Sequence, residues 1–286
     1  MEMETHMPAR FQVHPDVSEI VMDTKTGLQW QRDYGNPSNH ADAERYAESL
    51  RLGGFADWRL PTREELKGLV DYTRTAPAID VDAFPSTPPE HPDVFDEDDN
   101  DHIRFYWTST KTAFDPDLAW VVNFEFGNND HRAVHFDSYT RAVRGSTSTQ
   151  THKQNRFEIQ PHAQGDVVID REAGLMWQRS ADGVPYIYED ACVYAALVEA
   201  GGFNDWRLPS IEELHSLLDS TRFNPATDAH AFPHTKTDLS YWTQTYLGTY
   251  QDTLWVVNFK EGDDAHAEKV GKYFRVEYYV RAVRSL

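Results

Sequence analysis

The sequence contains a single cysteine, and the absence of a second thiol excludes any disulfide within the chain. Basic residues are also scarce: 27 Lys and Arg stand against 47 Asp and Glu, which gives a net charge of −20. A charge of this sign repels nucleic acid and anionic membrane surfaces, so neither is an expected partner. No apolar run approaches the roughly 20 residues that a membrane-spanning helix needs. Membrane insertion is therefore not expected either.

The first residues, MEMETHMPARF, lack the basic start and apolar core of a secretory signal peptide. Together with the lone Cys192, this predicts a chain that stays in a reducing compartment, the cytoplasm. Catalytic motifs are missing as well, because the sequence has no HExxH, GxSxG, Walker or paired-cysteine pattern. We therefore expect a non-catalytic protein, with an oxidoreductase or a metal-dependent hydrolase as the alternative.

What the sequence does contain is a long internal repeat. The string GGFxDWRLP begins at Gly53 and again at Gly201, an offset of 148 residues. The strings GLxWQR, YWT, WVVNF and RAVR also occur twice, in the same order. A period this long exceeds the roughly 20 to 50 residues of a solenoid repeat and predicts tandem globular domains. The expected layout is one domain at residues 12–145, a polar linker at 146–156 and a second domain at 157–286.

Each copy is expected to be an α+β domain, with two helices followed by a small twisted antiparallel sheet with long loops. Apolar residues at helical spacing predict a first helix that contains Ala43 and Leu50 and ends at Gly53-Gly54. A capping box of Thr62 and Glu65 predicts the start of a second helix, with Leu66, Leu69 and Val70 on its apolar face. A hairpin is expected over residues 19–31, and strands over residues 105–109, 118–124, 132–136 and 139–144.

The ordered set of GLxWQR, GGFxDWRLP, YWT, a Trp-x-x-Asn-Phe strand and a closing Arg-x-Val-Arg resembles the Lcl C-terminal domain family. This resemblance covers nearly all of both copies and implies a fold similar to C-type lectins, related distantly to the formylglycine-generating enzyme. It further implies that helices and sheet act as scaffold while long loops bind the ligand. The resemblance implies a cysteine pair, as found in many relatives, where this chain has Ala47 and Ala142, and Ala195 and Ala282. Both copies lack the pair, in agreement with a reducing compartment.

Within the repeated string, we interpret Asp-Trp-Arg-Leu-Pro as a structural brace for the helix start rather than as a binding motif. The recurring tryptophans are expected in the core. The residues assigned to this structural role are Trp58, Arg59, Trp206 and Arg207.

Ligand binding is predicted for segments that differ between the copies, because the shared strings form the scaffold. Exposed tyrosines in loops offer contact area at a small entropy cost. Asn123 and Asn258 have two open interpretations: they bind a ligand, or they satisfy loop backbone. The candidate ligand-binding residues are Asn123, Asn128, Tyr139, Tyr246, Tyr250, Asn258 and Tyr278.

An acidic insertion between Phe84 and Tyr106 exists only in the first copy. Asp96, Asp98 and Asn100 have the alternating oxygen spacing of a Ca²⁺ loop, although the glycine and the final glutamate of such a loop are missing. A solvated acidic loop is the alternative interpretation. If a cofactor exists, Ca²⁺ is the candidate.

The function predicted from the sequence is recognition of a glycan or a protein surface by two lectin-like domains. A display protein with variable loops is the alternative. The high negative charge disfavours a sulfated polyanion as the glycan. The sequence leaves the oligomeric state open.

Overall fold

The computed structural model of the protein describes residues 9–87, 105–146, 156–269 and 276–286. The chain divides into two compact units, the first within residues 1–149 and the second containing residues 150–286. Nearly all of the expected linker, and the whole acidic insertion with Asp96, Asp98 and Asn100, lie outside the described residues.

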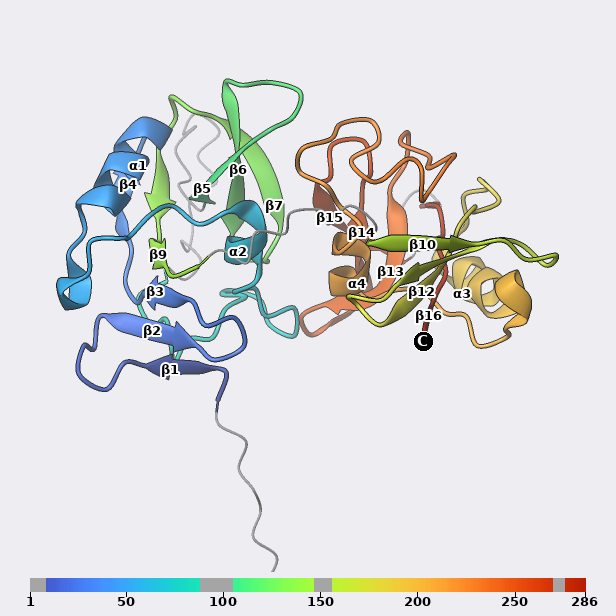
Figure 1. Ribbon diagram of the computed structural model, residues 1–286, viewed down its shortest axis with the longest axis horizontal. Helices are drawn as coiled ribbons and strands as arrows, with labels where there is room; N and C mark the ends of the chain where they lie inside the picture. The colour runs from blue at the N-terminus through green and yellow to red at the C-terminus, as the bar shows by residue number, and fades with distance from the viewer. Residues whose placement is uncertain (1–8, 88–104, 147–155, 270–275) are drawn as a thin grey trace, which may run out of the picture. The chain divides into compact units, whose positions relative to one another are not determined.

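Each copy has a mixed α/β fold that consists mostly of sheet, with two short α-helices and a one-turn 3₁₀ helix (Figure 1). The elements of the first copy are β1 (Phe11–Val13), β2 (Ile20–Asp23), β3 (Gln29–Gln31), β4 (Gly35–Ser38), α1 (His40–Ser49), η1 (Leu52–Gly54), α2 (Arg63–Lys67), β5 (Phe105–Lys111), β6 (Leu118–Asn123), β7 (Asn129–Ala133), β8 (Ser138–Thr140) and β9 (Val143–Arg144). Those of the second copy are β10 (Phe157–Gln160), β11 (Val167–Asp170), β12 (Leu175–Gln178), α3 (Tyr188–Leu197), η2 (Ala200–Gly202), α4 (Ile211–His215), β13 (Tyr241–Leu247), β14 (Tyr250–Val257), β15 (Asp264–Glu268) and β16 (Val283–Ser285).

Each copy contains two sheets, where the sequence predicts one. The first sheet has the order β1-β2-β3-β9 in one copy and β10-β11-β12-β16 in the other, so the last strand returns to pair with the third. The second sheet has the order β4-β8-β5-β6-β7 in the first copy and β13-β14-β15 in the second. The predicted strand at 139–144 is therefore split between the two sheets, as β8 and β9. The chain passes from one sheet to the other at Arg141 and Ala142.

Further boundaries differ from the prediction. The first helix ends at Ser49 rather than at Gly53-Gly54, and these glycines lie in the separate 3₁₀ helix η1. The helix that begins at the capping box ends at Lys67, and bonds from the amides of Leu69 and Val70 to carbonyls three residues earlier continue it as a tighter turn. Both side chains are still buried. The strand expected at 132–136 lies at 129–133, on the edge of its sheet, where a half-exposed polar strand has no apolar alternation to mark its register.

The repeated string holds the start of the second helix of each copy. In α4, the Ser210 hydroxyl accepts from the Glu213 amide at 3.1 Å, and the Glu213 carboxylate accepts from the Ser210 amide at 2.7 Å. Arg207 donates two hydrogen bonds to the same carboxylate, both 2.7 Å long. Arg207 is half-buried, so it clamps the capping residue at the edge of the core. In the first copy the equivalent residues are Arg59, Thr62 and Glu65.

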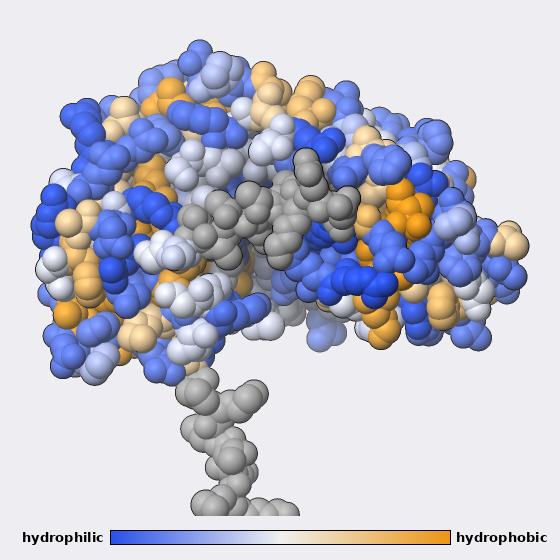
Figure 2. Space-filling view, in the orientation of Figure 1, coloured by the Kyte–Doolittle hydropathy of each residue, from blue (hydrophilic) through white to orange (hydrophobic). Residues whose placement is uncertain are grey.

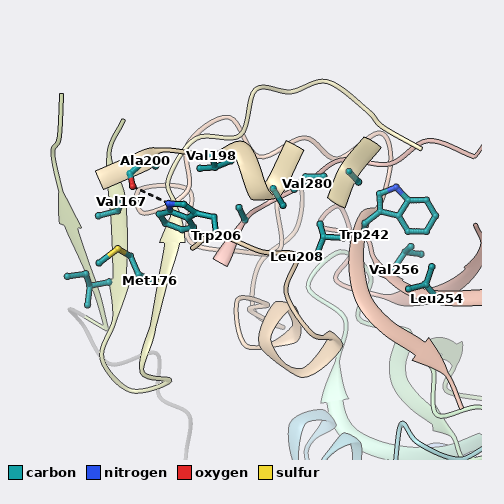
Figure 3. Packing of buried hydrophobic residues seen from close by; sticks show 14 residues of the cluster. Val167, Met176, Val198, Ala200, Trp206, Leu208, Trp242, Leu254, Val256 and Val280 are labelled. Atoms are coloured by element: carbon teal, nitrogen blue, oxygen red, sulfur yellow. Dashed lines mark hydrogen bonds between the residues drawn. The ribbon is translucent and has the colours of Figure 1, made fainter. Parts of the chain in front are cut away.

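The aspartate and tryptophan of the string tie it to other segments. Asp205 pairs with Arg284, at 2.6 Å, and the Arg284 guanidinium lies 4.0 Å from the centre of the Phe203 ring. The Asp of the string thus binds the closing Arg-x-Val-Arg and not its neighbour Arg207. Trp206 is buried, and its indole nitrogen donates to the Ala200 carbonyl at 3.2 Å (Figure 3). In the first copy these residues are Asp57, Arg144, Phe55, Trp58 and Leu52.

The core of the second copy joins both sheets to the helices. Its buried cluster includes Trp206 and Trp242 from different parts of the chain, together with Ala195 of α3 and Ala282 (Figure 3). Ala47 and Ala142 likewise share one cluster in the first copy. The two positions that carry the cysteine pair of relatives are therefore filled by packed alanines in both copies.

A fully buried arginine crosses between the sheets in each copy. Arg281 is 1% exposed and lies in the segment that leads from the second sheet into β16. Its guanidinium donates to the carbonyls of Gln178 and Arg179, at 3.2 and 3.0 Å, and to the Thr235 hydroxyl at 2.9 Å. The Phe232 ring packs against it, with 4.8 Å between guanidinium carbon and ring centre. In the first copy Arg141 donates to the carbonyls of Gln31, Arg32 and Asp33 and to the hydroxyl of Thr87, and it packs on Phe84.

We expect Arg281→Leu to destabilise the second copy far more than Arg284→Leu. The first change leaves two carbonyls and a hydroxyl in the interior without a donor, which costs about 3 kcal/mol or more. The second removes an ion pair with the exposed Asp205, which solvent screens, and a contact with one ring, so the loss should be much smaller. Urea unfolding of the full chain, followed by tryptophan fluorescence, measures both. Equal losses for the two variants would contradict the role given to Arg281.

We also expect the helix brace to make stability depend on acid pH. Burial raises the pKa of Glu213, but the hydrogen bonds from Arg207 and the Ser210 amide outweigh it, so the pKa of this carboxyl lies below its usual value. The stabilisation that ionised Glu213 provides is complete above the pKa of this carboxyl in the unfolded chain, about 4.3. It is lost as the pH falls through the lower pKa of the same carboxyl in the folded chain. Glu213→Gln and Arg207→Gln should both flatten the fall of melting temperature on acidification. An unchanged slope in both variants would refute this.

Candidate functional site

The two asparagines with open interpretations satisfy loop backbone. The Asn258 side-chain oxygen accepts from the Lys260 amide at 2.7 Å, and the Asn258 carbonyl accepts from the Gly262 amide at 3.0 Å. Asn123 makes the same bonds, with Glu125 and Gly127. The geometry of both residues is therefore that of a turn after the Trp-x-x-Asn-Phe strand.

The tyrosines predicted to bind a ligand lie in different surroundings. Tyr246 and Tyr250 belong to the adjoining strands β13 and β14, where a loop was expected, and they are 38% and 52% exposed. Tyr278 is half-buried against Trp242, with ring centres 4.9 Å apart. Tyr139 in β8 is half-buried and packs against other aromatic rings, and Asn128 precedes β7. Of this set, the hairpin residues Tyr246 and Tyr250 present the most exposed rings.

Tyr246 belongs to a cluster that connects the hairpin to helix α3. The Lys269 ammonium donates to the Tyr246 hydroxyl at 2.7 Å and lies 4.4 Å from the centre of that ring. The same ammonium lies 5.4 Å from the ring of Tyr188, the first residue of α3. The Tyr188 hydroxyl also interacts electrostatically with the Cys192 thiol, one helical turn further on, and the Tyr188 ring packs edge-on against Trp242. We call Tyr188, Cys192, Tyr246 and Lys269 the aromatic cluster.

Burial sets the protonation of two groups in the aromatic cluster. Cys192 is exposed overall, but partial desolvation of its thiol raises the pKa of Cys192, and the interactions with Tyr188 and with the charge of Lys269 oppose this rise only in part. Burial also raises the pKa of Tyr188, which shares hydrogen bonds with Cys192 and Tyr246. The cluster therefore presents neutral hydroxyl and thiol groups beside one ammonium, a surface suited to stacking and hydrogen bonding.

The first copy carries different chemistry at the equivalent place. The offset of 148 residues puts His40 opposite Tyr188 and Glu44 opposite Cys192, and the offset of 135 residues at Trp107 and Trp242 puts Lys111 opposite Tyr246. The His40 Nε2 atom lies 2.9 Å from the Thr108 carbonyl, which only accepts, so Nε2 carries the hydrogen. Burial lowers the pKa of His40. Its Nδ1 atom is then the acceptor that faces the Lys111 ammonium, 3.5 Å away.

A polar pocket adjoins this histidine. It has a volume of about 250 Å³ and is lined by Glu44, Glu48, Arg59, Leu60, Thr62 and Ser109. Glu44 reaches both the pocket and the imidazole, with 3.8 Å between its Oε1 atom and His40 Nδ1. One scaffold position thus has an imidazole, a carboxylate and an amine in the first copy, and aromatic rings with a thiol in the second.

Most of these residues are absent from the sequence-based candidates. The i, i+4 spacing of Tyr188 and Cys192 places both on one flank of a helix and could have indicated that they lie together. The difference between Lys111 in the first copy and Tyr246 in the second could have marked this strand position as variable. Lys269 had no signal, because only strand pairing brings β15 beside β14. Within the described residues, no group of three or more His, Cys, Asp or Glu side chains has an arrangement that could hold a metal ion. The predicted Ca²⁺ residues lie outside that range.

The architecture defines a duplicated mixed α/β module whose scaffold is held by the same bonds in both copies. The Lcl C-terminal domain family matches residues 19–144 and 166–284, and the chain belongs to this family, with two tandem copies. Membership suggests a binding or adhesin-like role. A search of curated proteins finds no match to the chain. In the parts of the chain that the structure describes, every helix is too short or too polar to cross a membrane.

We expect Cys192 to react more slowly with iodoacetamide than a cysteine in an unstructured peptide does. The thiolate is the reacting form, and burial raises the pKa of Cys192 above its ordinary value of about 8.5. Tyr188→Phe removes a hydrogen bond that favours the thiolate, so the reaction should slow further. The rate as a function of pH, measured by mass spectrometry, tests both statements. A midpoint at or below the ordinary value would contradict them.

Proposed function

We propose that the chain is a non-catalytic binding protein of two C-type-lectin-like domains, and that the second domain binds a carbohydrate at the aromatic cluster and Tyr250. The observation that carries the proposal is the exposed Tyr246 ring, which holds the Lys269 ammonium, with the exposed Tyr250 on the adjoining strand of the same hairpin. An aromatic ring packs against the apolar C–H face of a sugar, while hydroxyl and ammonium groups bond with its hydroxyls.

The charge of the chain narrows the ligand class. With a net charge of −20, binding of a sulfated or otherwise polyanionic glycan is opposed by long-range repulsion. A neutral glycan meets no such barrier, and one ammonium within hydrogen-bonding reach is enough to orient a hydroxyl. The absence of catalysis in this proposal is supported by the neutral state favoured for Cys192, the only thiol in the chain.

A glycan array probed with the full chain tests this proposal. Tyr246→Ala and Tyr250→Ala should each weaken binding by about tenfold, the loss expected when one stacking contact is removed. Tyr246→Phe keeps the ring and should lose less. The matched control is Phe136→Ala in the first copy, because Phe136 is an aromatic residue of similar exposure, 41%, outside the cluster.

A second measurement locates the sugar. A bound glycan should slow alkylation of Cys192, because the thiol lies within the aromatic cluster. If no glycan binds, or if the two alanine variants bind as well as the wild-type chain, the proposal fails. Capture of one purified protein that competes for Tyr246 would instead assign the site to a protein ligand.

A further inference from the structure

Helix α3 has apolar residues on the side that faces away from the core. Ala191 and Ala195 are buried, whereas Val193 and Leu197 are 58% and 73% exposed, with the exposed Ala196 between them. A surface helix normally carries polar residues on its outer side. An apolar face of this kind marks an interaction surface. We call Val193, Ala196 and Leu197 the α3 face.

The fold does not require this apolar face. The equivalent positions on α1 of the first copy are Arg45, Glu48 and Ser49, all exposed. The two helices have the same length and the same buried alanines, so the scaffold is compatible with a charged outer side. On the face drawn in Figure 2, hydrophilic residues predominate and apolar residues are interspersed among them. The α3 face is therefore specific to the second copy.

A pocket continues the α3 face. It has a volume of about 320 Å³, and Leu197 forms part of its lining together with Tyr194, Gln178 and Gly165. The Tyr194 hydroxyl already accepts from the Gln178 amide at 2.8 Å, so the lining is fixed by bonds within the domain. A side chain that covers Leu197 can enter this pocket without rearranging it.

The surroundings of the α3 face are acidic. Glu189 and Asp190 are exposed in the first turn of the helix, and Glu199 follows its end and lines the pocket. Asp166 lines the pocket too, and the nearby Arg179 is paired with it at 3.0 Å. The exposed charge around the face is thus negative. A second copy of the chain would bring the same carboxylates into an isologous contact, and an anionic membrane would be repelled.

We propose that the α3 face docks a basic amphipathic segment of a partner protein. The apolar side chains of that segment cover Val193 and Leu197 and enter the pocket, while its Lys or Arg residues meet Glu189, Asp190 and Glu199. This is the helix-in-groove mode of recognition, with charges that set orientation. Val193 and Leu197 lie on the outer side of α3, next to the flank that carries Tyr188 and Cys192, and the proposal does not depend on the carbohydrate site.

Helix α1 of the first copy provides the template for a matched variant of α3. Val193→Arg/Ala196→Glu/Leu197→Ser gives α3 the outer residues of α1, and it adds one positive and one negative charge, so the net charge stays at −20. The probe is a fluorescent amphipathic helical peptide of Leu and Lys, with a peptide of Leu and Glu in the same pattern as control. Fluorescence anisotropy with the full chain gives the affinity of each.

The Leu/Lys peptide should bind the wild-type chain and lose more than about tenfold in affinity for the triple variant, since two leucine-sized contacts are removed. The Leu/Glu peptide should not bind. Glu189→Lys/Asp190→Lys should weaken binding, and Tyr246→Ala should leave it unchanged. If circular dichroism shows that the triple variant is unfolded, Leu197→Ser alone replaces it, with a loss of about tenfold expected.

Several results would overturn the proposal. Equal binding of the Leu/Lys peptide to the wild-type chain and to the triple variant would show that net charge alone attracts the peptide. If the peptide does not bind the wild-type chain, the α3 face is not a docking surface for such a segment. Binding of the Leu/Glu peptide would exclude charge selection. A dimer of the wild-type chain in sedimentation that the triple variant lacks would assign the face to a second copy. Co-sedimentation with vesicles of phosphatidylcholine and phosphatidylglycerol, abolished in the triple variant, would assign it to a membrane.

Discussion

One buried guanidinium in each copy holds together the two sheets on which the rest of the structure depends. Arg141 and Arg281 lie where the chain leaves one sheet and enters the other, and both are almost fully buried. Their donors satisfy carbonyls that follow the third strand and a hydroxyl from a distant loop. Burial lowers the pKa of both groups, yet the ring of carbonyl and hydroxyl acceptors compensates for lost water. The guanidinium thus adds side-chain bonds next to the backbone pairing of the final strand with β3 or β12.

This shared frame allows the two copies to carry different surfaces. The same tryptophans and the same capping clamp support His40 in the first copy and Tyr188 in the second. The outer sides of α1 and α3 differ in the same way, charged in one copy and apolar in the other. Duplication thus gives one chain two similar scaffolds that carry different side chains at an equivalent surface position. This fits a binding role better than two identical sites would.

Local chemistry was well predicted from sequence, and long-range pairing was not. The start of α2 follows from Thr62 and Glu65 alone, because a capping box involves only four consecutive residues. The split of residues 139–144 between two sheets has no local signature, since β8 has only three residues and β9 only two. Tyr246 was expected in a loop because its segment differs between the copies, but it lies in a strand whose pairing is set by β14. Lys269 joined the site only through the pairing of β14 and β15.

The sequence by itself determined the duplication, the family and the capped helix starts, because these depend on residue order over short distances. Tertiary structure decided which partner each charged residue takes: Asp205 binds Arg284, 79 residues away, and not the adjacent Arg207. It also decided that Val193 and Leu197 stay exposed while Ala191 and Ala195 are buried. After its acidic first turn α3 has apolar or aromatic residues on every side, and such a run by itself specifies only weakly which side faces the core. Only packing against the sheets makes that choice, and so leaves one apolar side available for a partner.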